Sequence, residues 1–384
     1  MGNTQSDLQL TVKILTRDNP FGLRKCLKYL YKDITKTETR AFVVVIDDSQ
    51  NQIVRESNRK NLNAILDNKK ISHYYLGKEE FSTAYDNTYP DIKKFINLSL
   101  GRLGSGQYLP SRAKNISQLF DINSTHNLLL DDDILINPQQ QGCESIIAQI
   151  LERTRHDDTF TSVNLMGFPD LSLLQLLERS FINDENNLHN WNVDDSSFSL
   201  SGGFLVYPRD IEPTIFPNLY NEDYLWVAVN SVKNNKKTLK LQSKIGHRPS
   251  RLKTISSERL DFEAIGEIAF TTLNEFNIRS FINLKEIPNL KDIDSAICEY
   301  CSYVEYLVNL VSEKNQKLSI KSPYLNPIPY QDVKILLNEH LTIIYQISNH
   351  SIQKVFQEWN MQQMNWNLFR KCFSKIISEM VQFK

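Results

Sequence analysis

The feature that most constrains this chain is the run 127–133, in which three leucines are followed at once by three aspartates. The leucines predict a short buried strand, and the acids predict that the strand ends there. In an extended segment, Asp131 and Asp133 project to the same side, so either could bind a cation directly or through water. Adjacent carboxylates repel one another, and Mg²⁺ or Mn²⁺ removes that cost because both prefer hard oxygen ligands. The run therefore indicates a metal at a strand end. The alternative is a solvated acidic loop.

Strands and helices alternate through the first two thirds of the chain. Residues 8–15 and 41–46 are apolar runs typical of strands, and residues 21–31 between them carry leucines at helical spacing. Further strands are expected at 71–76, 161–168, 204–207 and 238–245, and further helices at 113–120, 144–153 and from 221 onward. Continuous apolar strands are typical of a parallel sheet covered on both faces, so the order predicts a doubly wound, Rossmann-like α/β fold. Ligands bind such folds beyond the carboxyl ends of the strands.

From about residue 258 the pattern becomes mostly helical. We therefore divide the chain into an α/β domain over 1–257 and a helical C-terminal region over 258–384. An aromatic stripe in this region is expected to pack in a core or between domains, and it consists of Trp359, Trp366, Phe369 and Phe373. Cys298 and Cys301 have a Cys-x-x-Cys spacing, but no second pair and no nearby histidine complete a zinc site.

The composition narrows the class of protein. A net charge of −1 over 384 residues gives no bulk electrostatic reason to bind nucleic acid. The N-terminus has no apolar signal segment, and no stretch approaches the ~18 apolar residues of a membrane span. Five cysteines, an odd and sparse set, are typical of reduced thiols. We expect a cytoplasmic protein. The alternative is peripheral attachment to the inner face of a membrane, or to a protein partner, through the C-terminal helices.

Two other acidic pairs stand at the ends of predicted elements. Asp47 and Asp48 follow the strand 41–46, where a carboxylate can accept a hydrogen bond from a nucleobase N–H or a ribose hydroxyl. The alternative is an aspartate that starts a turn. Glu222 and Asp223 precede an apolar helix, where one of them could act as a general base. The alternative is capping of the helix by acids.

Basic residues and glycines lie near these acids in the expected fold. His247 and Arg248 follow a strand, where the histidine can ligate a metal and the arginine can neutralise a diphosphate. The alternative is a solvated loop histidine. Gly202 and Gly203 provide a flexible approach to the strand 204–207.

A second basic group precedes the acidic strand. Arg112, Lys114 and Asn115 could contact phosphate or sugar hydroxyls, or they could form a charged helix face.

In their order along the chain, these motifs resemble those of GT-A-fold glycosyltransferases, and most closely the inverting enzymes of glycosyltransferase family 2. The motifs are Thr16-Arg17, Val45-Ile46-Asp47-Asp48-Ser49, Arg112-Ala113-Lys114-Asn115, Leu129-Leu130-Asp131-Asp132-Asp133, Gly202-Gly203 and Glu222-Asp223. The resemblance covers about residues 8–255. Two departures stand out. Leu103-Gly104-Ser105-Gly106 is separated from Arg112 by Pro110, and Asp-Asp-Ser replaces the commoner Asp-Asp-Gly.

The resemblance implies a role for each matched residue. Asp131 and Asp133 match the metal-binding acids, and His247 resembles a late histidine that helps to hold the metal or the diphosphate. Asp223 matches the catalytic base, with Glu222 beside it. The expected donor contacts are Thr16, Arg17, Asp47, Asp48, Arg112, Asn115, Asp132, Gly202, Gly203 and Arg248.

The leading hypothesis is a Mn²⁺- or Mg²⁺-dependent transfer of a sugar from a nucleotide diphosphate donor to an acceptor hydroxyl, with inversion. By resemblance, a UDP-sugar is the default donor. A nucleotidyltransferase also combines a nucleotide site with acids and metal, but it usually has a Gly-rich basic loop after the first strand, and residues 16–22 are a poor version of one. A third hypothesis is a non-catalytic binding protein on a GT-A-like fold. The retained acids argue against it.

Overall fold

The computed structural model describes most of the chain. The described residues are 8–37, 39–67, 71–105, 110–120, 122, 124–136, 145–154, 159–167, 172–182, 200, 202–248, 254–275, 278, 281, 287–314, 316, 318–320 and 325–382. Gly106, Ser201 and residues 249–251, which belong to motifs noted above or adjoin them, lie outside these ranges.

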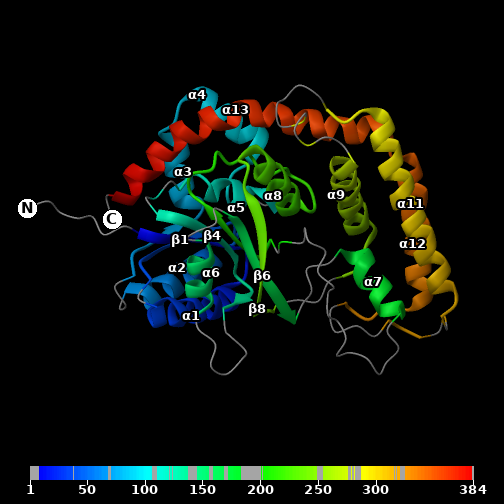
Figure 1. Cartoon of the computed structure of the whole chain (residues 1–384), viewed down its shortest axis with the longest axis horizontal. Coiled ribbons are helices and arrows are strands. Elements are labelled where there is room, and N and C mark those ends of the chain that lie inside the picture. Colours follow the sequence, from blue (N-terminus) through cyan, green and yellow to red (C-terminus); the bar gives the residue numbers. More distant parts are fainter. Residues whose placement is uncertain are drawn as a thin grey trace, which may run out of the picture.

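An eight-stranded mixed sheet forms the centre of the first part of the chain (Figure 1). Its strands lie in the order β3-β2-β1-β4-β7-β6-β8-β5. Their bounds are β1 Leu8–Thr16, β2 Ala41–Asp47, β3 His73–Leu76, β4 Ser124–Asp131, β5 Ile134–Leu135, β6 Thr159–Gly167, β7 Phe204–Pro208 and β8 Lys237–His247. Parallel pairing joins β3, β2, β1 and β4, and also joins β6 to β8, whereas β7 runs antiparallel to β4 and β6. The carboxyl ends of β1, β2, β4 and β8 therefore meet at one edge, with the start of β7.

Helices cover both faces of the sheet, as the continuous apolar strands predict. Val43 and Val45 of β2 face one cluster, whereas Val44 and Ile46 face the other, because side chains alternate along a strand. The first cluster includes side chains of α1 (Pro20–Thr37), α2 (Gln52–Leu66) and α6 (Ile146–Thr154). The second includes α3 (Lys78–Asp86), α4 (Pro90–Phe95), the π-helix η2 (Ile96–Leu100) and α5 (Pro110–Ser117).

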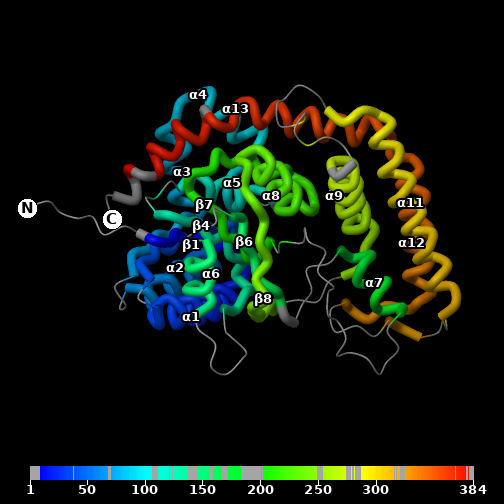
Figure 2. The backbone as a smooth tube through the Cα atoms, viewed as in Figure 1, coloured from blue at the N-terminus to red at the C-terminus, as the bar shows by residue number. Residues whose placement is uncertain are grey.

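The remaining helices stand beside the sheet or cross over it. The helices are α7 (Leu173–Ile182), α8 (Glu222–Lys233), α9 (Ser257–Glu275), α11 (Leu290–Ser312), α12 (Tyr330–Gln346) and α13 (Asn349–Gln382). Helix α9 packs against α7, α8, α11 and α12, and α13 runs from α11 back to α3 and α4 (Figures 1 and 2). One hydrophobic cluster extends from Val44 in β2 to Ile377 in α13. The helical region therefore shares a core with one face of the sheet.

The predicted fold class, α/β with a helical C-terminal region, is confirmed. One local expectation was wrong: β4 ends at Asp131, and the chain turns through Asp132 and Asp133 instead of staying extended. It turns because β5 must reverse to pair antiparallel with β8. The sequence also did not predict α2, α3, α4, η2, α7 or the short strand β5. Within the described residues, no helix combines the length and the apolar content needed to cross a bilayer.

Candidate active site

The three aspartates take three different positions. The backbone N–H of Asp131 donates to the carbonyl of Gly203 at 3.0 Å, which joins the end of β4 to the start of β7. The Asp132 carboxylate accepts hydrogen bonds from the side chains of Thr16 and Asn19. Burial raises the pKa of Asp132 to about 8, although the hydrogen bond from Thr16 opposes this. Asp132 therefore holds the loop after β1, and its predicted contact with the donor stays a prediction.

Asp133 lies against the end of β8. The register of β5 and β8 pairs Ile134 with His247, and Nε2 of His247 lies 3.4 Å from Oδ2 of Asp133. The backbone N–H of Arg248 donates to the carbonyl of Asp133 at 3.0 Å. The other carboxylate oxygen of Asp133, Oδ1, is buried and has no hydrogen-bond partner in the described part of the chain. A buried acceptor without a partner is costly unless something else occupies it.

This pair fits a divalent cation. Carboxylate oxygen and imidazole nitrogen suit Mn²⁺, and the orphaned Asp133 Oδ1 is a ready ligand. Among the described residues, no three His, Cys, Asp or Glu side chains gather closely enough to hold an ion alone. A Mg²⁺ or Mn²⁺ ion that also binds substrate phosphates needs only one or two carboxylates from the protein. The residues therefore fit a cation that arrives with a diphosphate.

Asp131 faces a different set of charges. Burial raises its pKa to about 7, the nearby ammonium group of Lys114 lowers it, and the carboxylates of Asp133 and Asp223 raise it further. His247 also contributes, in the lowering direction. Asp131 therefore lies between the Asp133–His247 pair and the acids of α8, and it links the two halves of the site.

Lys114 joins the two acids that start α8. Its Nζ donates to Oε1 of Glu222 at 2.8 Å and lies 3.3 Å from Oδ2 of Asp223. Burial disfavours the charge of Lys114, but the carboxylates of Asp223 and Glu222 raise its pKa well above the usual range. Burial raises the pKa of Glu222, with Lys114 opposing. The arrangement is a compact cluster of one cation and two acids.

The two glycines leave room for this cluster. A Cβ on Gly202 would lie 1.1 Å from Oδ2 of Asp223, so the carboxylate occupies the space that any other residue would fill. A Cβ on Gly203 would lie 3.1 Å from Cδ1 of Ile134 and 3.4 Å from Oδ2 of Asp131. Gly202 therefore leaves room for the close approach of Asp223, and its predicted contact with the donor stays a prediction.

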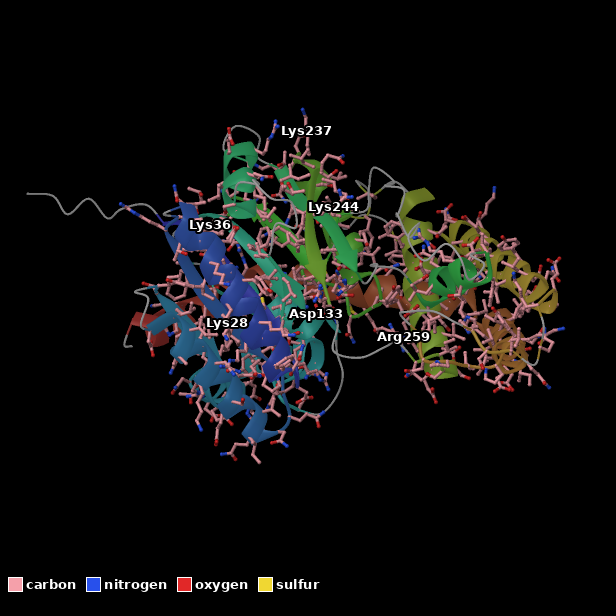
Figure 3. The ribbon with its side chains drawn as sticks, turned by 90° about the horizontal axis from the view of Figure 1, so that it is seen from below. Lys28, Lys36, Asp133, Lys237, Lys244 and Arg259 are labelled. Carbon is pink, nitrogen blue, oxygen red and sulfur yellow. The ribbon has the colours of Figure 1, made fainter. Side chains whose placement is uncertain are left out.

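A cavity of about 560 Å³ opens beside these acids. Its wall on the sheet side includes Asp131, Gly203, Asp223 and His247, and its opposite wall is α9. The α9 residues that line it are Glu258, Arg259, Phe262 and Glu263. Figure 3 shows Asp133 on the sheet side of this region and Arg259 on the side of α9. The volume suits a ligand of the size of a sugar with part of its acceptor.

Asp47, the first of the two acids at the end of β2, is hydrogen-bonded to other residues of the protein. Oδ2 of Asp47 accepts hydrogen bonds from Asn58 and Tyr75, and Oδ1 accepts one from the backbone N–H of Ser49. All three contacts hold the loop after β2. Asp47 is fully buried. Its predicted contact with a nucleobase stays a prediction.

Asp48 has cationic partners. Its Oδ1 accepts hydrogen bonds from the backbone N–H of Gly104 at 2.8 Å and from Arg112 at 3.0 Å. Arg17 lies 3.6 Å from Oδ2. Burial raises the pKa of Asp48, and the contacts with Gly104, Arg112 and Arg17 oppose the rise. Predicted donor contacts from three separate segments, Arg17, Asp48 and Arg112, are thus brought together here.

The side chain of Asn115 is hydrogen-bonded to the protein backbone. Its Nδ2 donates to the carbonyl of Phe216 at 3.0 Å, and its Oδ1 accepts from the backbone N–H of the same residue at 2.7 Å. Asn115 therefore fixes the segment that leads to the acids of α8. The sequence reasoning missed this contact, and it also missed the contribution of α9, which carries no recognisable motif.

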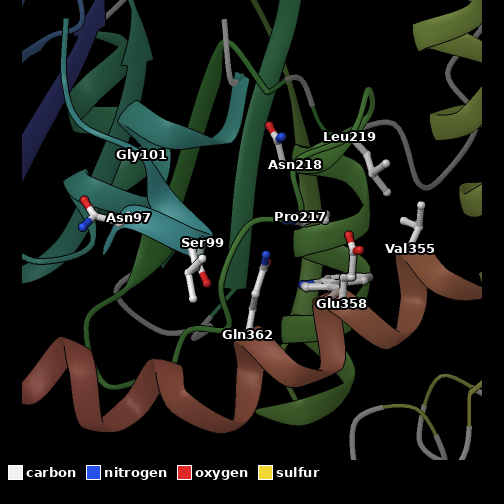
Figure 4. A pocket seen from close by; sticks show the side chains of 11 residues that line it. Asn97, Ser99, Gly101, Pro217, Asn218, Leu219, Val355, Glu358 and Gln362 are labelled. Atoms are coloured by element: carbon white, nitrogen blue, oxygen red, sulfur yellow. The ribbon is translucent and has the colours of Figure 1, made fainter. Parts of the chain in front are cut away.

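A second cavity of about 310 Å³ lies between η2, residues 217–219 and α13 (Figure 4). Asn97, Asn218, Glu358 and Gln362 provide polar groups to its lining. Leu219 lines this cavity, and the next residue along the chain, Tyr220, lines the larger one. Consecutive residues of one segment therefore line two different cavities.

Fold and site together define an α/β protein with an acidic site at the carboxyl edge of a mixed sheet. No protein-family model matches the chain, and no curated protein matches it. Among solved structures it is similar to S. aureus TarS 1-349, with 14% identity and a TM-score of 0.38, covering 94% of this chain and 91% of that one. The chain is also similar to a longer S. aureus TarS structure, with 16% identity and a TM-score of 0.38. That match covers 79% of this chain and only 50% of the TarS chain.

Two further similar structures are of named enzymes. One is the mannosyltransferase PcManGT from Pyrobaculum calidifontis in complex with GDP-Man and Mn²⁺, with 9% identity and a TM-score of 0.39 over 89% of this chain and 87% of that one. The other is glucosyl-3-phosphoglycerate synthase from M. tuberculosis, with 9% identity and a TM-score of 0.40 over 66% and 76%. GT-A-fold glycosyltransferases, the family suggested by the sequence, thus recur among these structures.

Proposed function

We propose that this chain is a glycosyltransferase that moves a sugar from a nucleotide diphosphate donor to an acceptor hydroxyl, with inversion at the anomeric carbon. One observation carries the proposal. The carboxylate of Asp223, held between Lys114 and Gly202, lines the same cavity as Asp131 and His247. A candidate base and a candidate diphosphate site therefore face one space of suitable size.

Asp223 is the proposed general base. It takes the proton of the acceptor hydroxyl while the acceptor oxygen forms a bond to the anomeric carbon. The bond from that carbon to the donor phosphate breaks on the opposite side, and the nucleoside diphosphate leaves with the electron pair. Lys114 lies 3.3 Å from the carboxylate of Asp223 and holds it at the wall of the cavity.

Asp133 and His247 would hold the divalent cation, and Asp131 would assist from the adjacent position. When bound, the cation supplies positive charge that stabilises the leaving diphosphate. Arg248, whose backbone is fixed against Asp133, is a candidate to neutralise the same group.

Arg17, Asp48 and Arg112 form the proposed nucleotide end of the site, because predicted donor contacts gather there. Uridine stays the default base by resemblance alone. The proposed acceptor is a hydroxyl of a glycan, a lipid-linked sugar, a peptide or a small molecule. We place the reaction in the cytoplasm or at the inner face of a membrane.

A thermal-shift panel of nucleoside diphosphates, with and without Mn²⁺, tests the site. We expect one nucleoside diphosphate to raise the melting temperature only when Mn²⁺ is present, because ligands stabilise the state they bind. The variant Asp131→Ala/Asp133→Ala should lose the shift. Asp210→Ala is the control, since Asp210 pairs with Lys236 at 3.1 Å on the surface. No shift with any nucleotide would favour the binding-protein alternative.

Turnover tests the base. Asp223→Asn should lose transfer by at least about 100-fold, because the amide cannot take the acceptor proton, and it should keep the nucleotide-dependent shift. The product should be a nucleoside diphosphate. Release of pyrophosphate would indicate a nucleotidyltransferase, and wild-type turnover in Asp223→Asn would contradict the assignment of the base.

A further inference from the structure

Helix α1 carries a stripe of basic side chains on its outer surface. The exposed cations are Arg24, Lys25, Lys28, Lys32 and Lys36. Side chains three or four residues apart are neighbours on the surface of a helix, so the stripe runs for about 18 Å along the helix axis. Figure 3 shows Lys28 and Lys36 on this helix.

The helix has one acid, and that acid points inward. Asp33 is 2% exposed, and its carboxylate accepts hydrogen bonds from the hydroxyl of Ser145 at 2.6 Å and from the backbone N–H of Ile147 at 2.9 Å. Both donors lie at the start of α6, so the negative charge is directed into the protein. Every charge on the exposed surface of α1 is therefore positive.

The neighbouring helices do not cancel the charge of the stripe. On α2 the exposed Glu56 and Lys60 offset each other, and on α6 the exposed Glu152 and Arg153 do the same. The chain as a whole has a net charge of −1, so the positive charge of α1 is a local excess.

The electrostatics of the helix itself do not account for the stripe. Like charges four residues apart destabilise a helix, and Arg24, Lys28 and Lys32 are spaced in this way. The helix dipole favours cations only in the last turn, where Lys36 lies. A partner with negative charge would replace this repulsion by attraction.

Exposed apolar side chains lie in the first turns of α1 and α2. Phe21 is 68% exposed and Ile53 is 75% exposed. Both helices start at the carboxyl edge of the sheet, because β1 and β2 are parallel and each helix follows its strand. The ammonium group of Lys25 lies 4.2 Å from the centre of the Phe21 ring. Phenylalanine beside a row of lysines is typical of helices that lie in the interface of a membrane.

We infer that α1 docks on a lipid surface with anionic headgroups, and that Phe21 and Ile53 insert at the boundary between headgroups and acyl chains. A soluble polyanion fits less well, because a chain of phosphates offers no apolar contact to these two side chains. Of the two cavities described above, neither is lined by α1, so the stripe offers a ridge rather than a groove for a single chain. Docking in this way brings the carboxyl edge of the sheet close to the lipid.

Flotation of the full chain with lipid vesicles tests the docking. We expect binding to phosphatidylcholine vesicles that contain about one third phosphatidylglycerol, and at least about 10-fold weaker binding to phosphatidylcholine alone. Each cation near an anionic surface strengthens binding about fivefold, so Lys25→Ala/Lys28→Ala/Lys32→Ala should weaken it by about 100-fold. Raising the NaCl concentration from about 0.1 to 0.5 M should weaken binding of the wild type more than that of the variant, because salt screens the attraction.

The matched control is Lys291→Ala/Lys354→Ala/Lys371→Ala, which removes the same charge from exposed positions on α11 and α13. It should bind the vesicles as the wild type does. Phe21→Ala should weaken binding about 10-fold at both salt concentrations, because apolar contact with the lipid is not screened by salt. Vesicle binding needs no turnover, so its result is independent of whether the chain transfers a sugar.

The docking is contradicted if the wild type does not bind the anionic vesicles, or if the α1 variant binds them as well as the wild type does. Loss of binding in the control variant would also overturn it and would move the attachment to the C-terminal helices. Binding of long-chain polyphosphate without binding of vesicles would assign the stripe to a soluble polyanion instead.

Discussion

At the scale of single residues, Lys114 organises the candidate catalytic acids. It is nearly buried, and its ammonium group contacts both Glu222 and Asp223. The sequence allowed two roles for this lysine, a phosphate contact or a charged helix face. The charged helix face is wrong, because Lys114 is buried and contacts two acids more than 100 positions away in the chain. The phosphate contact stays a prediction.

Replacing Lys114 should change both stability and the pH dependence of the reaction. Lys114→Met keeps the length of the side chain but leaves two buried acids without a cation, which should lower the free energy of unfolding by about 3 kcal/mol. Lys114 lowers the pKa of Glu222, so that pKa should rise in the variant, and the part of the pH–rate profile that depends on Glu222 should move to higher pH. Chemical denaturation and a kcat profile from pH 5 to 9 measure the two effects.

Lys233→Met is the matched control, since Lys233 pairs with the exposed Glu212 at 3.7 Å near the end of α8. The control should keep the wild-type pH–rate profile. An unchanged profile in Lys114→Met would mean that the rate does not depend on the charge of Glu222.

At the scale of elements, α9 completes a site that the strands begin. It supplies one wall of the cavity and lies against the start of α8 through Gly266. Burial raises the pKa of Glu267 to about 7, and the neighbouring Glu263 raises it further, whereas the polar side chains of Asn221 and Ser172 lower it. The charge of Glu267 in turn raises the pKa of Tyr300 and of Tyr303 in α11.

This raised pKa predicts a loss of stability with rising pH. Below pH 4.5, the ordinary pKa of a glutamate, Glu267 is protonated in both the folded and the unfolded chain. Between pH 4.5 and about 7 the unfolded chain releases the proton first, so the folded state loses stability as pH rises through about 7. Glu267→Gln lacks this titration. Its free energy of unfolding should therefore rise by about 2 kcal/mol relative to that of the wild type as the pH increases from 5 to 8.5.

Denaturant unfolding at several pH values measures this difference. Glu299→Gln is a control on the exposed face of α11 and should follow the wild-type curve. A constant difference between Glu267→Gln and wild type across the range would mean that Glu267 does not titrate in it.

At the scale of the whole molecule, α13 ties the helical region to the sheet. Trp359 donates from its indole N–H to the carbonyl of Ile215 at 3.0 Å, and Trp366 donates to the carbonyl of Pro213 at 2.9 Å. Both carbonyls belong to the segment that continues to the acids of α8. The path of α13 over the sheet is visible in Figure 2, and its aromatic stripe packs in the core, as predicted.

Trp366→Ala should destabilise the whole molecule. Trp366 is fully buried and packs against Phe369 with ring centroids 5.6 Å apart, so its loss should cost about 3–5 kcal/mol. Trp366→Phe keeps most of the packing and loses the hydrogen bond to Pro213, so it should cost about 1–2 kcal/mol. Met364→Ala, at a position that is 60% exposed on the same helix, should cost less than about 0.5 kcal/mol. Equal values for Trp366→Ala and Met364→Ala would show that α13 does not stabilise the sheet.

Patterns along the chain predicted part of the local structure of the site. The run 127–133 marked a buried strand and its end, because leucines and aspartates differ so sharply in their cost of burial. The order of strands and helices indicated the fold class, and Glu222–Asp223 marked the start of a helix, which is α8. The turn at Asp132 was not predicted, since it depends on the pairing of β5 with β8.

The sequence by itself therefore determined the strands, the acids at their ends and the helical character of the C-terminal region, because each of these follows from the periodicity and polarity of neighbouring residues. Only the tertiary structure decided which acids hold loops and which face the cavity. Asp132 and Asp47 bond to the protein, Asp223 meets Lys114, and α9 closes the site. These contacts join residues far apart in the chain, and their geometry depends on how the whole sheet and its helices pack together.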